Sequence, residues 1–522
     1  MSDEPLLTWK GRRVRALGDG PETAARKVPA PPLRPGGLFF VPSPLEGWGL
    51  DLLLDRLPPE AAVVVFEKDQ DLDRRCAADF LRFLGPRAKD PRLFRLREDT
   101  ETAVQELFHR LPLAKLRRCE FLTLNGAWMP HAARYREVFA RLEQGLTRWW
   151  SNRITGVHLG PLWVRNLFDN LTSPGLGWNP WPHWGSDPVL VCGAGITLEE
   201  ALPWARAHRT RLRIVAADTS LPVLKAWGLV PDAVVCLEAQ HANLRDFAGW
   251  RGAPVALFAD LTSLPGGSRV FGTAPHWFIS EFAHLGLWNR WPWDPTTVPR
   301  LPPLGSVGVA AAWVTWRLTQ GPVVLAGLDF SFPSGKTHAR GAPALASLAE
   351  STHRLRPMEQ VGTWERPGVR PTASGWLTTP VMEGYAAVLA DQAAKEANRT
   401  WVWSSQGLPL GLPVWSRASR PSTETETATP GATSEPSPAP QDWARGELQR
   451  WQNILASFDR ANSNPHDEAL WKDLEQRLGE VDYLTFSFPD PEFRRATDWL
   501  ARAQGQVRWA ARRWDKTDSL SR

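Results

Sequence analysis

The sequence predicts an α/β protein with two Rossmann-like α/β domains, each built on a mostly parallel sheet, and a C-terminal helical domain after a disordered linker. Three observations support this prediction. Short apolar runs without polar alternation are separated by amphipathic helical patterns, which is typical of a parallel sheet covered on both faces. These runs fall into two sets, which indicates two domains. A stretch rich in Ser, Thr, Pro and Glu then precedes a purely helical pattern.

The predicted strands set the boundaries of the two α/β domains. The first set lies at residues 36–41, 61–66, 93–97 and 119–124. The second set lies at residues 188–193, 212–218, 233–238, 254–260 and 322–329. We therefore expect an N-terminal domain at 1–150, a connector at 151–187 and a second α/β domain at 188–416. In sheets of this kind, ligands bind beyond the carboxyl ends of the strands, at a switch in strand order.

The last part of the chain changes in composition twice. Residues 417–441 are dominated by Ser, Thr, Pro and Glu, so they cannot bury enough apolar surface to order themselves. We expect a disordered linker there. Residues 442–522 show helical spacing of Trp, Leu and Arg, as in ELQRWQNILASF at 447–458. This spacing predicts a small helical domain.

Composition narrows the class of protein. With 43% hydrophobic and 22% charged residues among 522, the chain has the balance of a soluble globular protein. Its net charge of +5 is too small and too scattered to indicate nucleic-acid binding, although it mildly favours an anionic ligand. No stretch approaches the roughly 18 apolar residues that a membrane span requires, and we expect no membrane span.

The cysteines point to a reducing compartment. Cys76, Cys119, Cys192 and Cys236 lie far apart in the sequence and form no CxxC or Cys/His grouping. We therefore expect neither a disulfide framework nor a zinc site. The N-terminus has no apolar segment of a secretory signal, so we expect a cytoplasmic protein.

A glycine-bearing turn follows the first strand of the second set. Gly193 and Gly195 precede a predicted helix that has Thr197 at its start. Such a turn at a helix N-terminus presents N–H groups to a phosphate, although many strand–helix turns need glycine only for their geometry. Both interpretations remain open from this motif.

Two acidic residues end neighbouring strands of the same set. Asp218 ends the strand at 212–218, and Glu238 ends the strand at 233–238. Asp218 either caps the next helix or contacts a ribose hydroxyl or a metal ion. Two acids at one sheet edge favour a binding role more than either acid alone.

The segment before and after the strand at 322–329 adds further candidates. Gly305 and Ser306 precede an Ala-rich helix, where they can bind an anion or simply allow close packing. Asp329 ends the strand, and Lys336 and His338 follow in the next loop. Lys336 can neutralise a phosphate, and His338 is of the residue type whose intrinsic pKa suits proton transfer near neutral pH. The chain has no Walker A, complete GxGxxG or HExxH motif, which argues against P-loop hydrolysis and zincin chemistry.

Three segments, in this order, resemble a known family. They are GAGITLEEALPW at 193–204, IVAADTSLPVLKAWGLVPDAVVCLEAQ at 214–240 and PLGSVGVAAAWVTWRLTQGPVVLAGLDFSFPSGKTHARG at 303–341. Together they resemble the domain shared by the motility-associated (Maf-type) flagellin glycosyltransferases and the archaeal MptE-like 6-hydroxymethylpterin diphosphokinases. The segments at 36–150 and 163–171 also resemble the N-terminal and inter-domain regions of the Maf-type proteins.

This resemblance implies a sialyltransferase-like sheet and a CMP-activated nonulosonic acid as donor, without a required cofactor or metal. The acceptors would be Ser or Thr hydroxyls of flagellin. The resemblance also assigns roles to the candidate residues. Those expected to line the nucleotide are Gly193, Gly195, Asp218, Glu238, Gly305 and Ser306, and those expected at the reacting end are Asp329, Lys336 and His338.

Two alternatives belong to other classes. The first is ATP-dependent pyrophosphoryl transfer to 6-hydroxymethyl-dihydropterin, which would require Mg²⁺ held by Asp218, Glu238 and Asp329. The second is a catalytically idle protein that binds flagellin, since Ile196 and Glu238 replace the Pro and Asp usual in the family. The additional N-terminal domain and C-terminal helices favour the glycosyltransferase, because a small pterin needs no such platform.

Overall fold

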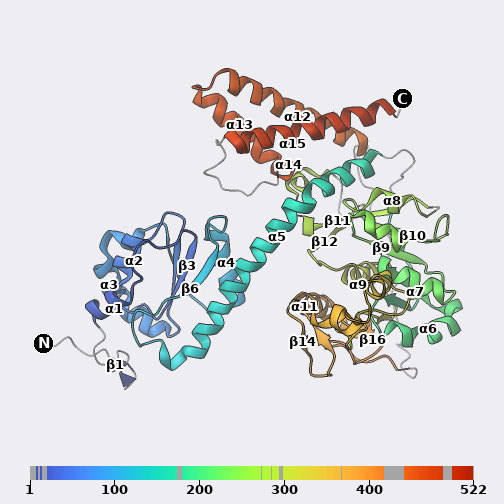
Figure 1. Cartoon of the computed structure of the whole chain (residues 1–522), viewed down its shortest axis with the longest axis horizontal. Helices are drawn as coiled ribbons and strands as arrows, with labels where there is room; N and C mark the ends of the chain where they lie inside the picture. The colour runs from blue at the N-terminus through green and yellow to red at the C-terminus, as the bar shows by residue number, and fades with distance from the viewer. Residues whose placement is uncertain are drawn as a thin grey trace. The chain divides into compact units, whose positions relative to one another are not determined.

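The chain forms two compact units, the first extending to Val157 and the second beginning at His158. Figure 1 shows their helices and strands. The computed structural model describes residues 8–9, 12–13, 20–172, 179–271, 273–283, 285–292, 298–365, 367–416, 440–485 and 497–520. Helix α5 (Ala132–Thr172) contributes residues to both units.

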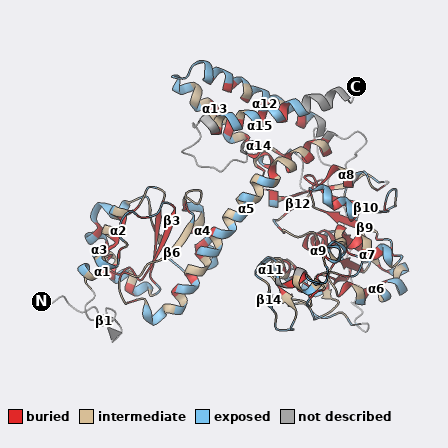
Figure 2. Cartoon of the chain, in the orientation of Figure 1, coloured by how far each residue is buried: buried red, intermediate tan, exposed pale blue. Residues whose placement is uncertain are grey.

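The first unit contains a four-stranded parallel sheet in the order β5-β4-β3-β6. Its strands are β3 (Gly37–Pro42), β4 (Ala62–Phe66), β5 (Leu93–Leu96) and β6 (Arg118–Phe121). The helices are α1 (Pro21–Lys27), α2 (Leu50–Arg56), α3 (Gln70–Leu84), α4 (Glu101–Arg110) and the first part of α5. Every residue of β3 and β4 is buried, as expected for strands covered on both faces (Figure 2).

The second unit contains an eight-stranded parallel sheet in the order β12-β11-β10-β9-β8-β7-β13-β16. Its strands are β7 (Val189–Cys192), β8 (Arg213–Ala217), β9 (Ala233–Cys236), β10 (Ala256–Asp260), β11 (His276–Ser280), β12 (Arg300–Leu301), β13 (Val323–Ala326) and β16 (Thr400–Val402). The chain adds strands β7 to β12 in one direction and then returns to place β13 and β16 on the other side of β7. The switch in strand order therefore lies between β7 and β13.

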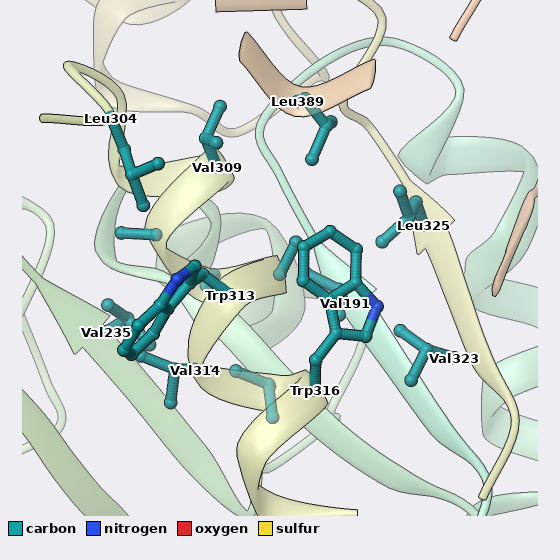
Figure 3. Packing of buried hydrophobic residues seen from close by; sticks show 14 of the residues in the cluster. Val191, Val235, Leu304, Val309, Trp313, Val314, Trp316, Val323, Leu325 and Leu389 are labelled. Carbon is teal, nitrogen blue, oxygen red and sulfur yellow. The ribbon is translucent and has the colours of Figure 1, made fainter. Parts of the chain in front are cut away.

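Helix α9 (Val307–Leu318) supplies the apolar centre of this unit. It packs on β7, β8, β9 and β13 and is buried almost all round, which explains its Ala-rich sequence. Trp313 and Trp316 of α9 lie among Val191, Val235 and Leu325 of the strands (Figure 3). The remaining helices of the α/β part are α6 (Leu198–Ala207), α7 (Leu221–Ala226), α8 (Pro265–Ser268), α10 (Pro343–Glu350) and α11 (Pro380–Ala394).

The C-terminal helices belong to the same compact unit as the second sheet. They are α12 (Pro440–Ser463), α13 (Glu468–Glu480), α14 (Asp482–Thr485) and α15 (Thr497–Leu520). Phe168 of α5 packs edge-on against Trp451 of α12, with ring centroids 4.7 Å apart. The expected linker at 417–441 lies outside the described residues up to 439, and its last two positions belong to α12.

The predicted fold class is confirmed, and so are the strands of both predicted sets. The sequence analysis missed β11, β12 and β16. Two of these are too short to produce a periodic signal, with two residues in β12 and three in β16. All four cysteines are free. In the part of the chain that the structure describes, no helix is both long and apolar enough to span a membrane.

Candidate functional site

A cavity of about 450 Å³ opens at the carboxyl ends of β8, β9, β10 and β11. Each strand delivers one polar residue to it, because the strands are parallel and end at the same edge of the sheet. These residues are Asp218, Glu238, Asp260 and Ser280. The opposite walls come from the start of α9, the loop that carries His338, and α5. The cavity therefore gathers groups from segments far apart in the sequence.

Asp218, like Asp260, is 1% exposed. Its Oδ1 accepts a hydrogen bond from the backbone N–H of Thr219 at 2.7 Å, and its Oδ2 accepts one from Nδ2 of Asn243 at 3.0 Å. The same Nδ2 donates to Oδ2 of Asp246 at 3.1 Å. Burial, followed by the nearby charge of Asp246, raises the pKa of Asp218 to about 7. This carboxyl group can therefore gain or lose a proton near neutral pH.

The pKa values of Asp246 and Asp260 are raised for the same reason as that of Asp218. Burial raises the pKa of Asp246 to about 6 and that of Asp260 to about 6. Asp260 accepts hydrogen bonds from the backbone N–H groups of Thr262 at 2.6 Å and Ser280 at 2.5 Å, so it joins β10 to β11. Glu238 is less enclosed and accepts from the backbone N–H of Gln240 at 2.9 Å. Three of the acids that line this cavity therefore have pKa values raised toward neutral pH, where they can bind or release a proton.

The N-terminus of α9 opens toward the cavity, which is lined by Gly305 and Val307. Ser306 occupies the N-cap position, but its side chain makes no capping hydrogen bond. The first N–H groups of a helix have no partner within the helix, and they carry its positive dipole end. Gly305 has φ +69°, and a Cβ there would lie 2.8 Å from the Tyr385 ring, so only glycine fits. This helix start can receive an anion.

His338 lies on the loop that follows β13 and lines the same cavity. Its Nδ1 is 3.0 Å from Oγ1 of Thr337, which is buried. The next residue anchors the loop, since the N–H of Ala339 donates to the carbonyl of Ala194 at 2.9 Å. A titratable ring is therefore held at the cavity by a fixed backbone.

The structure brings together four of the residues predicted from the sequence, namely Asp218, Glu238, Gly305 and His338. It does not place Gly193, Gly195, Ser306, Asp329 or Lys336 among the residues that line this cavity. Lys336 instead forms an ion pair with Glu199 at 2.9 Å. The side chain of Lys336 is thus engaged by Glu199, and its expected role at the reacting end stays a prediction.

The glycine turn and Asp329 lie at the switch between β7 and β13, where they contact each other. A Cβ on Gly195 would lie 2.5 Å from Oδ2 of Asp329. That carboxylate accepts hydrogen bonds from the backbone N–H of Thr197 at 3.0 Å and from its hydroxyl. Burial raises the pKa of Asp329 to about 6. The cavity at the ends of β8 to β11 thus lies beside the switch point, and a ligand role for the glycine turn and Asp329 stays a prediction.

The sequence analysis missed Asn243, Asp246 and Asp260. Asp260 gave a usable signal, because it ends the predicted strand at 254–260 in the same way as Asp218 ends its strand. Asn243 lies in a short 3-10 helix after β9 (His241–Arg245) and Asp246 follows it, and no local pattern distinguishes them from surface polar residues. Within the described residues, no group of three or more His, Cys, Asp or Glu side chains is arranged to hold a metal ion.

Comparison with known proteins agrees with this fold. Residues 165–335 match the family model described as 6-hydroxymethylpterin diphosphokinase MptE-like. An uncharacterized protein of Treponema pallidum (strain Nichols) is 30% identical over 334 residues, which cover 62% of this chain and 57% of that protein. A second uncharacterized protein of the same organism is 28% identical over 161 residues, covering 28% of this chain and 77% of that protein.

A solved structure extends the comparison to nearly the whole chain. It is the structure of a Maf glycosyltransferase from Magnetospirillum magneticum AMB-1, with a TM-score of 0.54 and 13% sequence identity. The superposition covers 97% of this chain and 89% of that one. At this identity, the likeness establishes a common fold.

Proposed function

Because residues 165–335 form an MptE-like domain in a chain with the Maf glycosyltransferase fold, we propose that this protein is a glycosyltransferase of the Maf type. Its donor would be a CMP-activated nonulosonic acid, and its acceptors would be Ser or Thr hydroxyls of flagellin. The cavity at the ends of β8 to β11 would be the donor site. The donor and the acceptor follow from the family resemblance, and the position of the site follows from the geometry.

The single observation that carries the proposal is the meeting of an uncapped helix N-terminus with a cluster of acids in one cavity. The start of α9 suits the phosphate of an activated sugar, because free N–H groups and the helix dipole favour an anion. Asp218 and Glu238 suit hydroxyl or amino groups of the nucleotide or sugar, since carboxylates accept hydrogen bonds from both. The cavity volume also lies within the roughly 300–1,000 Å³ typical of small-molecule sites.

The chemistry assigned to the site is a single displacement. The bond between the anomeric carbon and the phosphate oxygen breaks, and CMP leaves with its negative charge facing α9. The acceptor oxygen forms the new bond to the anomeric carbon, and its proton passes to His338, which acts as general base. Asp218 is too enclosed to reach a protein acceptor, so we assign it to donor binding. Lys336 is assigned no direct role, because it is paired with Glu199.

The proposal is tested by ligand-induced stabilisation followed by a transfer assay. We expect CMP to raise the Tm of the full chain without added metal, and ATP with Mg²⁺ to leave it unchanged. We expect His338→Ala to reduce transfer from a CMP-activated nonulosonic acid to flagellin by about 10²-fold or more. His208→Ala, which alters an exposed histidine at the end of α6, is the matched control. Transfer by His338→Ala at the wild-type rate would refute the role given to His338.

The diphosphokinase alternative is favoured by the description of the matching family model. It requires Mg²⁺, for which Asp218, Glu238 and Asp329 were the candidate ligands. Asp329 is committed to Thr197 and does not line the cavity with the other two. A Tm increase with ATP and Mg²⁺, but not with CMP, would favour this alternative. A Tm that changes with neither CMP nor ATP and Mg²⁺ would favour the catalytically idle binding protein.

A further inference from the structure

One stripe of helix α5 faces the candidate site. Leu159, Trp163, Asn166 and Asn170 follow one another at intervals of four, three and four residues, so they lie on the same side of the helix. Leu159 and Trp163 line the cavity directly. The two asparagines continue the stripe where the helix passes the loops that follow β9 and β10.

Both asparagines bind backbone carbonyl groups of those loops. Nδ2 of Asn166 donates to the carbonyl oxygens of Ala239 at 3.0 Å and Thr262 at 3.1 Å. Nδ2 of Asn170 donates to the carbonyl oxygens of Leu261 at 2.9 Å and Ser263 at 3.0 Å. The two residues are 1% and 3% exposed. Each carboxamide therefore uses both of its N–H groups on backbone acceptors inside the protein.

The orientation of Asn170 follows from these donated bonds. Its Oδ1 is buried and has no hydrogen-bond partner within the described residues. Rotating the carboxamide would turn this oxygen toward the carbonyls of Leu261 and Ser263, where two acceptors would face each other. The position thus requires a donor, which neither an aspartate nor a leucine of similar size supplies.

The two loops that Asn166 and Asn170 hold directly follow two acids of the cavity, Glu238 and Asp260. Ala239 directly follows Glu238, and residues 261–263 directly follow Asp260. The loops are also joined to each other, since the N–H of Leu264 donates to the carbonyl of Glu238 at 2.9 Å. Asn166 bridges the two loops, and Asn170 holds the second loop on both sides of Thr262. Small movements of these loops would shift Glu238 and Asp260 relative to each other.

We propose that Asn166 and Asn170 are positioning residues, which fix the two loops of the donor site and thereby set its affinity for the nucleotide. The assignment rests on the proposed function of the cavity. The asparagines touch no substrate in this account. They act through Glu238 and Asp260, whose places relative to the start of α9 decide whether a donor fits.

The test uses the full chain with Asn166→Ala and Asn170→Ala. Asn179→Ala is the matched control, because Asn179 also donates from Nδ2 to a backbone carbonyl, that of Ala274, before the amino end of β11. Two properties are measured in each protein: hydrogen exchange of the segments 238–243 and 260–264, and the Kd for CMP. If an alanine variant does not fold, the corresponding serine variant replaces it, since serine retains one donor.

We expect both site variants to exchange these segments about tenfold faster and to bind CMP about tenfold more weakly, while the control matches the wild type. The serine variants should lie between the alanine variants and the wild type. Exchange like that of the control, or faster exchange with unchanged CMP affinity, would overturn the positioning role alone. If the wild-type protein binds no CMP, the proposed function fails, and the positioning role fails with it.

Discussion

Gly193 and Gly327 lie so close that a Cβ on Gly193 would be 2.2 Å from the carbonyl oxygen of Gly327. The approach is held by two hydrogen bonds, from the N–H of Gly193 to the carbonyl of Ala326 and from the N–H of Gly195 to that of Gly327, each 2.8 Å long. These backbones fill the edge of the sheet between β7 and β13, where the strand order switches. The candidate site therefore lies beside the switch, above β8 to β11.

The first prediction is that Gly193→Ala destabilises the protein without removing a ligand contact. The new methyl group meets backbone and not a flexible side chain, so we expect a loss of about 1–3 kcal/mol in the free energy of unfolding. Urea denaturation measures this change. Gly384→Ala is the control, because Gly384 lies within α11 with open space around it, and alanine there should stabilise the helix by about 0.5–1 kcal/mol. Unchanged stability of Gly193→Ala, with weaker CMP binding, would restore the phosphate role.

The second prediction concerns the buried carboxyl group of Asp218. Its pKa is about 7 in the folded protein against 3.8 for an ordinary aspartate. Since the folded pKa is raised, its stabilising contribution is complete below pH 3.8 and is lost as the pH rises through 7. Asp218→Asn should therefore raise the free energy of unfolding at pH 8 by on the order of 2 kcal/mol, and by less at pH 5.

Thermal or urea unfolding at the two pH values checks this prediction, and CMP titration of the same variant checks the site. We expect greater stability and weaker CMP binding together. The buried carboxylate destabilises the ligand-free protein, but it accepts hydrogen bonds from the bound nucleotide. An Asp218→Asn protein that is less stable at pH 8 than the wild type would show that the carboxylate is needed for the fold itself.

The third prediction concerns the ion pair between Arg290 and Glu447. Two hydrogen bonds of 3.0 and 2.8 Å join the guanidinium to the carboxylate, which is 4% exposed and also accepts from Tyr483. Arg290→Ala leaves the buried carboxylate with only a 3.4 Å ion pair to Arg450 and the hydroxyl of Tyr483, so we expect a loss of about 3 kcal/mol in the free energy of unfolding. Arg445→Ala, which breaks an exposed pair with Asp442, should cost less than about 0.5 kcal/mol.

The same pair gives a pH dependence in the acid range. Burial of Glu447 opposes its charge, but the hydrogen bond and charge of Arg290 outweigh this and hold the pKa of Glu447 below its usual 4.5. Because the folded pKa is lowered, this stabilisation is present above pH 4.5 and is lost as the pH falls below it. The decrease in Tm below pH 4.5 should therefore be shallower in Arg290→Ala than in the wild type.

The fourth prediction separates a ligand role of the α9 N-terminus from a structural one. Ser306→Asp supplies a capping carboxylate that competes with a phosphate for the free N–H groups. We expect the free energy of unfolding to increase by about 0.5–1 kcal/mol and CMP affinity to fall by about tenfold. Gly20→Asp caps α1, which also has no capping side chain, so it should leave CMP affinity unchanged. If Ser306→Asp bound CMP as tightly as the wild type, the phosphate would not bind at the start of α9.

The sequence predicted the parts of this protein that depend on local pattern. Apolar runs such as VVVF, which precedes Glu67, predict strands because buried parallel strands are apolar on both faces. Asp218 and Glu238 could be assigned to one edge, because parallel strands end together. Asn243 could not be found in this way, since its contact with Asp218 arises only when the segment after β9 folds back over the end of β8.

The packing at the switch point is a tertiary feature that the sequence does not reveal. Gly193 and Gly195 look the same whether they leave room for a phosphate or for a neighbouring strand, and here the room is taken by Gly327 and Asp329. Lys336 is similar, because nothing local indicates that Glu199, which lies far away in the sequence, will pair with it. Both outcomes depend on tertiary packing.

The structure of the full chain in complex with CMP would test the central claim most directly. We expect the phosphate to lie within hydrogen-bond distance of the first turn of α9, with Asp218 or Glu238 contacting the nucleoside and His338 on the side from which the acceptor hydroxyl approaches. CMP bound at the turn formed by Gly195 and Asp329, outside the cavity above β8 to β11, would contradict the account.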